Sequence, residues 1–174
     1  MLFKDTIIKG CKVIDLETFK DSRGTFSRVY CTKEFEEEGL KTDFVQSNLS
    51  SNFKSGTLRG MHFQKVPYQE VKLVKCLKGS IFDVVVDLRK NSPSYLKWFG
   101  AELSEKNGTM MYVPQGCAHG YQSLEENTLI HYMVNSFYEP SFEGGLYYDD
   151  PLIKIKWPLP ISDISEKDKS WKLL

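Results

Sequence analysis

The chain has 174 residues, of which 41% are hydrophobic and 26% charged, values ordinary for a globular protein with one core. Lys and Arg number 23, as do Asp and Glu, so the basic excess of a nucleic-acid binder is absent. No apolar run approaches the roughly 18 residues of a membrane span, and the N-terminus has no signal-peptide run. We therefore expect neither nucleic acid nor a membrane as a partner.

The first predicted element along the chain is a helix in CTKEFEEEGL, residues 31–40. Thr32 is its expected N-cap, the acids that follow suit the helix dipole, and Gly39 is the expected stop. At the other end of the chain, SEKDKSWKLL is expected to add a further helical turn.

Most of the remaining chain is predicted to form strands. VKLVKCL and SIFDVVVDL flank a tight turn at Lys78-Gly79, and YLKWFGAEL and NGTMMYVP are predicted to pair across Asn107-Gly108. AHGYQSL and TLIHYMVNSFY follow, on either side of residues 125–127. Short strands at regular turn spacing indicate an all-β sandwich or barrel. With no repeat or linker, we expect one domain over residues 1–174.

Four cysteines, at positions 11, 31, 76 and 117, include no CxxC pair of a metal or redox site. Free thiols in a reducing cytoplasm are the simplest interpretation.

The stretch TLRGMHFQ, residues 57–64, places Arg59 and His62 in a β-rich segment. In a regular strand these two side chains point to opposite faces. Both can meet one ligand only if the strand bends or bulges, which Gly60 permits. Otherwise His62 is a hydrogen-bonded core histidine and Arg59 a surface residue.

The segment GTMMYVPQGCAHG has the spacing G-x5-P-x-G-x2-H of the second cupin motif, ending at His119. The first cupin motif needs HxH, but this chain has His62-Phe63-Gln64 there. A His/Gln/His set without a carboxylate is a poor metal site. We expect a cupin-like jelly-roll barrel with short peripheral helices, no metal and no cofactor, although a metal cupin remains the alternative.

Further segments carry a family resemblance: DSRGTF, QSN, LRGMHFQ, KLVKCLKGSIFDVVVDLRKNSPSYLKW, VPQGCAHGY, DDPLIKIKWP and ISEKDKS. Together they make the chain similar to the dTDP-4-dehydrorhamnose 3,5-epimerase family over almost its whole length. The resemblance implies a jelly-roll homodimer that inverts C3 and C5 of a nucleoside-diphosphate 4-keto-6-deoxysugar through an enolate.

The resemblance also implies a role for individual residues. His62 matches the family's base, Asp168 the aspartate that orients it, and Tyr132 the acid, while Lys72 matches the lysine that holds the enolate oxygen. The matching substrate-binding positions are Arg23, Arg59 and His119 for diphosphate and sugar, Gln46 and Asn48 for polar contacts, Tyr138 for stacking on the base, and Glu143 and Lys167. Without the resemblance, Tyr132 is more simply a core aromatic, the commoner fate of a strand tyrosine, Asp168 a helix cap, and Lys167 and Glu143 surface charges.

The chain departs from the family at two places. Arg28 stands where the family has a glutamate near the nucleotide, and because arginine pairs with guanine O6 and N7, a GDP-linked substrate is an alternative to dTDP. QEVK stands at Lys72 where the family more usually has QGK, so Glu70 and Val71 are expected to reshape the sugar pocket. The same motifs are also compatible with inversion at C3 alone, with 3,4-ketoisomerisation, or with non-catalytic binding of a sugar nucleotide.

Overall fold

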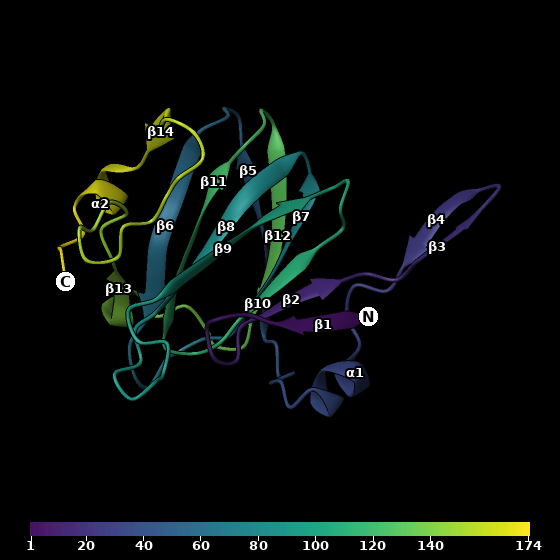
Figure 1. The fold of residues 1–174 in the computed structure, drawn as a ribbon, viewed down its shortest axis with the longest axis horizontal. Helices are drawn as coiled ribbons and strands as arrows, with labels where there is room; N and C mark the ends of the chain where they lie inside the picture. Colours follow the sequence, from purple (N-terminus) through teal and green to yellow (C-terminus); the bar gives the residue numbers. More distant parts are fainter.

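Two β-sheets face each other in this computed structural model, which describes residues 1–174 (Figure 1). The first sheet has the order β1-β2-β10-β7-β12-β5, and the second the order β13-β6-β11-β8-β9. The strands of the first sheet are β1 Leu2–Asp5, β2 Lys12–Asp15, β10 Met110–Val113, β7 Lys72–Lys78, β12 Thr128–Val134 and β5 Gln46–Asn52. Those of the second are β13 Glu143–Gly145, β6 Thr57–Gln64, β11 Cys117–Ser123, β8 Ser80–Asp87 and β9 Trp98–Ser104. This is the expected cupin-like jelly roll.

The chain passes repeatedly from one sheet to the other, and three of these crossings are tight turns with a residue of positive φ. β7 and β8 are joined at Gly79, β9 and β10 at Gly108, and β11 and β12 at Asn127, each with a positive φ. The expected pairing of the strands flanking Asn107-Gly108 is wrong, because β9 pairs with β8 while β10 pairs with β2 and β7. Only Gly108 of the dipeptide has a positive φ, so the hairpin turn that Asn-Gly favours does not form, and each strand buries its inner face by pairing within its own sheet.

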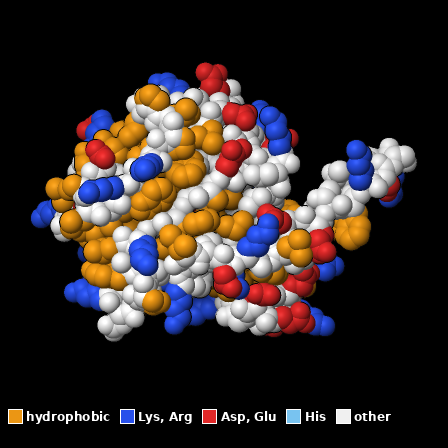
Figure 2. Space-filling model, viewed as in Figure 1, with side chains coloured by type: hydrophobic (Ala, Val, Ile, Leu, Met, Phe, Trp, Pro, Cys, Tyr) orange, Lys and Arg blue, Asp and Glu red, His pale blue; other side chains and the backbone are white.

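Core side chains fill the space between the sheets. Buried residues from both sheets, including Val74, Ile81, Val85, Leu103 and Ile130, form the largest cluster. Figure 2 shows further hydrophobic side chains over the side of the molecule where β8, β9 and the C-terminal segment lie. The core closes one part of the barrel, and the remaining inner faces are available to line a cavity.

Three short helical segments flank the sheets: α1 Thr32–Glu37, the 3-10 turn η1 Pro140–Phe142, and α2 Glu166–Lys169. The expected N-cap of α1 is wrong by one residue, since Cys31 occupies the cap position without a side-chain cap bond. Thr32 instead donates from its hydroxyl to the Tyr30 hydroxyl, 3.2 Å away. Gly39 ends the segment as expected, with a φ of +69°. Phe35 anchors α1 because it is fully buried against the first sheet.

The hairpin of β3 (Thr18–Asp21) and β4 (Gly24–Ser27) projects away from both sheets (Figure 1). Its Phe19 and Phe26 are 69% and 67% exposed. Short β14 (Asp163–Ile164) instead returns to the barrel, parallel to β6, and leads into α2. None of the helices has the length and apolar character needed to cross a membrane. The four cysteines are free thiols, as expected.

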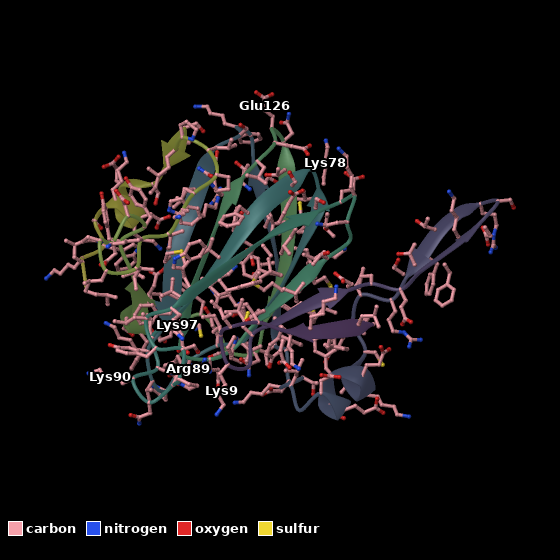
Figure 3. The ribbon with its side chains drawn as sticks, viewed as in Figure 1. Lys9, Lys78, Arg89, Lys90, Lys97 and Glu126 are labelled. Carbon is pink, nitrogen blue, oxygen red and sulfur yellow. The ribbon has the colours of Figure 1, made fainter.

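The loop after β8 is held in place by hydrogen bonds to the buried carboxylate of Asp87. Asp87 accepts hydrogen bonds from Arg89 Nε at 2.7 Å, Ser92 Oγ at 2.5 Å and Ser94 Oγ at 2.6 Å. Arg89 also donates to the Lys9 carbonyl at 2.7 Å, and Figure 3 shows these two residues near each other, at the opposite end of the molecule from Lys78. Burial alone would raise the pKa of Asp87, but the hydrogen bonds from Arg89 and the two serines lower it to about 2.

Candidate active site

A bulge in β6 brings Arg59 and His62 to one side of the strand. The register between β6 and β11 shifts between His119 and Tyr121, and Gly60 has a φ of +146°. A Cβ at Gly60 would lie 2.6 Å from the Gly120 Cα, so a side chain does not fit there. Arg59 and His62 line the same cavity. The predicted distortion at Gly60 is therefore confirmed.

His62 forms a hydrogen-bonded pair with Asp168 from α2. The His62 Nε2 to Asp168 Oδ1 distance is 2.7 Å, and the second carboxylate oxygen accepts from the Gly60 amide at 3.2 Å. The Ser165 hydroxyl caps α2 by accepting a hydrogen bond from the Asp168 amide. This bond helps to hold Asp168 in place beside the His62 ring. Burial would raise the pKa of Asp168, but its hydrogen bond and charge interaction with His62 lower it. An ionised Asp168 can only accept, so Nε2 carries the proton and the Nδ1 lone pair is left to act as a base.

Tyr132 and Lys72 lie on neighbouring strands of the opposite sheet. Tyr132 on β12 is in register with Val74 on β7, and Lys72 with Val134, so both side chains lie on the inner face. Burial raises the pKa of Tyr132, and the negative charge of Glu70 raises it further. The phenol therefore stays protonated at neutral pH and can donate a proton.

A second histidine–carboxylate pair lies beside the first. His119 on β11 is directly opposite His62 on β6, and its Nε2 is 2.8 Å from Asp83 Oδ1. Asp83 is fully buried, and its other carboxylate oxygen has no hydrogen-bond partner. Arg59 is oriented by a hydrogen bond from its Nε to Asn52 Oδ1 at 2.8 Å. The cavity thus presents an arginine and a histidine to an anionic ligand.

The cavity has a volume of about 480 Å³ and is lined from both sheets and from α2. A second compartment of about 420 Å³ shares four of its lining residues, namely His62, Lys72, Tyr132 and Lys167. The second compartment contains four of the predicted binding residues, Gln46, Asn48, Tyr138 and Glu143. Tyr138 donates from its hydroxyl to Glu143 at 3.1 Å, and Lys167 pairs with Glu143 at 2.7 Å. Eleven of the thirteen site residues named from the sequence therefore line these two joined spaces.

The other two, Arg23 and Arg28, lie outside both compartments. Arg23 is on the projecting hairpin, 88% exposed, with its guanidinium 2.6 Å from Asp21. Arg28 follows β4 and pairs with Glu34 at 3.0 Å. Neither arginine therefore reaches the cavity of its own chain.

The cupin metal positions are occupied by His62, Gln64 and His119, and Gln64 serves a structural role. Its amide nitrogen is 3.1 Å from the carbonyls of Tyr68 and Phe137, and its oxygen accepts from the Glu139 amide at 2.8 Å. These contacts tie two loops together. The donor set does not fit a metal ion, because an amide bound to backbone groups stands where an imidazole would be needed.

Two lining residues, and one that hydrogen-bonds to His119, were not identified from the sequence. Ser50 lies on the same face of β5 as Gln46 and Asn48, so the period of two along that strand was an available signal. Asp83 was marked by its position as a charged residue inside the apolar run SIFDVVVDL. Tyr121 gave no such signal, because tyrosine is a common core residue in strands.

The fold and the sequence are similar to those of proteins named dTDP-4-dehydrorhamnose 3,5-epimerase. A family model described as dTDP-4-dehydrorhamnose 3,5-epimerase matches residues 5–174. The chain is 42% identical to a protein of that name from Methanothermobacter thermautotrophicus, over 99% of this chain and 94% of the relative. A crystal structure of that name from Elizabethkingia anophelis has a TM-score of 0.95 and 41% identity, covering 99% of this chain and 96% of that one. Another, from Bacillus anthracis with TDP and PPi bound, has a TM-score of 0.96 and 37% identity over 99% of both chains.

Proposed function

Because the chain belongs to the dTDP-4-dehydrorhamnose 3,5-epimerase family, we propose that its cavity inverts C3 and C5 of a dTDP-linked 4-keto-6-deoxysugar with His62 as base and Tyr132 as acid. The protein is an enzyme of the isomerase class, an epimerase. The observation that carries the residue assignment is the 2.7 Å pair of His62 and Asp168 on one wall of a cavity whose other wall holds Tyr132.

The base step follows from the geometry of the histidine pair. Hydrogens at C3 and C5 are acidic because both carbons adjoin the C4 ketone, and removing either one gives an enolate. His62 takes the proton at the nitrogen that Asp168 leaves free, and the ionised carboxylate stabilises the imidazolium that forms. Lys72 places a positive charge where the enolate oxygen develops.

Inversion requires reprotonation from the face opposite to the base. His62 and Arg59 come from β6 of one sheet, whereas Tyr132 and Lys72 come from β12 and β7 of the other. The protonated phenol of Tyr132 can therefore deliver a proton to the face that His62 does not reach. The result is a change of configuration with no change in composition.

Substrate binding uses the charged and polar rim of the same spaces. Arg59 and His119 suit the diphosphate, since a guanidinium forms paired charge-assisted hydrogen bonds with phosphate oxygens. Tyr138 is 56% exposed at the second compartment and offers a ring face to the nucleotide base. Gln46, Asn48, Glu143 and Lys167 add polar contacts there.

A homodimer explains the position of Arg23. Its hairpin projects from the molecule with Phe19 and Phe26 uncovered, so if Arg23 binds substrate it must do so in the cavity of a second copy. Mixing Arg23→Ala with His62→Ala protein tests this. Mixed dimers would contain a cavity with both residues intact, so activity should rise above that of either variant alone. Unchanged activity in a mixture shown to exchange subunits would refute the shared site.

Arg28 gives no support to a GDP-linked substrate, since its charge is paired with Glu34 of the same chain. We propose dTDP as the carrier, and a reducing cytoplasm as the location because the four thiols are free.

Proton exchange is the direct test of the reaction. The protein is incubated with dTDP-4-keto-6-deoxyglucose in deuterated water, and the sugar is followed by NMR. Deuterium at C3 and C5 is the expected result. Deuterium at C3 alone would indicate a 3-epimerase or, if the product carbonyl has moved, a ketoisomerase. A folded protein that binds the nucleotide sugar but exchanges neither position would refute the proposal in favour of a binding module.

A further inference from the structure

Glu70 lies in the segment between β6 and β7, and the proposed chemistry gives it no role. Its side chain is only 11% exposed and lines the second compartment together with His62, Lys72 and Tyr132. A carboxylate removed from water to this extent is unfavourable unless it is paired. The partners of Glu70 therefore show what it is placed to do.

Two side chains hold the carboxylate from opposite ends. One oxygen is 2.8 Å from Lys72 Nζ, and the other lies 3.3 Å from the Gln64 amide nitrogen, whose two hydrogens it shares with the Tyr68 and Phe137 carbonyls. Gln64 is itself fixed by its hydrogen bonds to the Phe137 carbonyl and the Glu139 amide. A chain of contacts thus runs from that loop through Gln64 and Glu70 to the ammonium group of Lys72.

The backbone between Glu70 and Lys72 is also fixed. Val71 is 2% exposed in the hydrophobic cluster under α1, and its amide donates to Asn135 Oδ1 at 2.7 Å. With Val71 pointing outward into that cluster, residues 70 and 72 share the inner side of the chain. Lys72 is 12% exposed, so its ammonium has little freedom to find another partner.

Glu70 also acts on the proposed acid. Burial raises the pKa of Tyr132, and the negative charge of Glu70 raises it further, whereas the positive charge of Arg59 lowers it. The titratable and charged groups that share a compartment with Tyr132 are Arg59 and His62 on β6, Lys72 on β7, His119 and Tyr121 on β11, Glu70, Tyr138 and Glu143 in the loops and β13, and Asp163, Lys167 and Asp168 near the C-terminus.

We propose that Glu70 is a positioning residue of this active site, whose carboxylate holds the Lys72 ammonium against the sugar and keeps a negative charge beside Tyr132. The inference rests on the proposed function, because Lys72 and Tyr132 take their roles from it. Glu70 does not contact the substrate in this proposal; it acts through Lys72, which holds the enolate oxygen, and Tyr132, which delivers the proton.

The test replaces Glu70 with glutamine, which keeps the shape and removes the charge. Glu38→Gln is the control, because Glu38, 38% exposed, pairs with Lys12 at 3.1 Å outside both compartments that hold Tyr132. We expect Glu70→Gln to lower kcat by about tenfold or more with KM changed by less than about threefold, because Lys72 acts mainly on the enolate. The alkaline limb of the kcat profile should move to lower pH, since loss of the carboxylate lowers the pKa of Tyr132.

A second measurement does not depend on turnover. The ultraviolet phenolate signal of each protein, minus that of its Tyr132→Phe counterpart, reports the ionisation of Tyr132 alone. It should appear at lower pH in Glu70→Gln than in the wild type. Glu70→Asp keeps the charge but shortens the reach to Lys72, so it should lower kcat while leaving the Tyr132 titration nearly in place.

A Glu70→Gln protein with unchanged kcat and unchanged Tyr132 titration would overturn the proposal and leave Glu70 a structural ion pair. If that variant does not fold, a Glu70→Asp protein with wild-type kcat would overturn it equally. Failure of the proposed function would look different, because wild-type protein would then exchange no deuterium at C3 or C5.

Discussion

Replacing Asp168 with asparagine should slow turnover strongly while leaving the fold in place. Asparagine can still accept from His62 Nε2, so the ring keeps its orientation, but the charge that stabilises the imidazolium is lost. Two unit charges about 4 Å apart interact by about 4 kcal/mol at an effective dielectric constant near 20. His62 is 29% exposed, so solvent reduces this value, and we take about 2–4 kcal/mol. That range corresponds to a loss of roughly 30- to 1,000-fold in kcat.

The assay is the rate of deuterium incorporation at C3 and C5, measured by NMR beside calorimetric binding of dTDP. The asparagine amide would face the Gly60 N–H, so a loss of stability of about 1–3 kcal/mol is also expected. Asp150→Asn is the matched control, because Asp150 is also buried but accepts only from the Leu152 and Leu174 amides. Asp168→Asn protein that turns over within about threefold of the wild type would refute the reasoning, since its charge would then have no part in the base step.

Three further predictions concern the acid, the bulge in β6 and the buried loop carboxylate. Tyr132→Phe should retain proton removal by the base yet lose epimerised product by about 100-fold or more, as measured by comparing exchange with product formation; equal product rates would contradict the acid assignment. Gly60→Ala should lower the free energy of unfolding in urea by about 1–3 kcal/mol, because the added Cβ meets the Gly120 backbone. Gly24→Ala is the control, since Gly24 has a similar φ of +135° but lies in open space, and it should lower that free energy by less. Equal losses would refute the steric argument. The folded pKa of Asp87, about 2, lies below the ordinary value of 3.8, so its stabilisation is present above about pH 4 and is lost as the pH falls through about 2. Asp87→Asn should therefore be less stable than the wild type at pH 7, with the difference shrinking towards pH 2 in urea unfolding; a pH-independent difference would contradict this.

The period of two identified the strands, but it could not assign them to sheets. YLKWFGAEL and NGTMMYVP were correctly predicted as strands, and the turn at Gly108 was correctly placed. Their pairing was wrong because only Gly108, and not Asn107, has a positive φ, so the turn is not the hairpin turn that Asn-Gly favours. The cap of α1 was misplaced for a related reason, since Thr32 finds its hydrogen-bond partner in Tyr30 and not in the helix.

The sequence by itself indicated the jelly roll and, through its resemblance to one family, the residues of the proposed chemistry, because strand patterns and motif spacing are local properties of the chain. Only the tertiary structure decided which of those residues meet. Asp168 reaches His62 across 106 positions of sequence, and Asp83 reaches His119 by strand register, contacts that no local pattern encodes. Arg23 shows the reverse case, since its motif DSRGTF is intact but its hairpin leaves the barrel. The pairing of Glu70 with Lys72 likewise depends on Val71 being buried outward, which is decided by packing against α1 and not by the residues on either side.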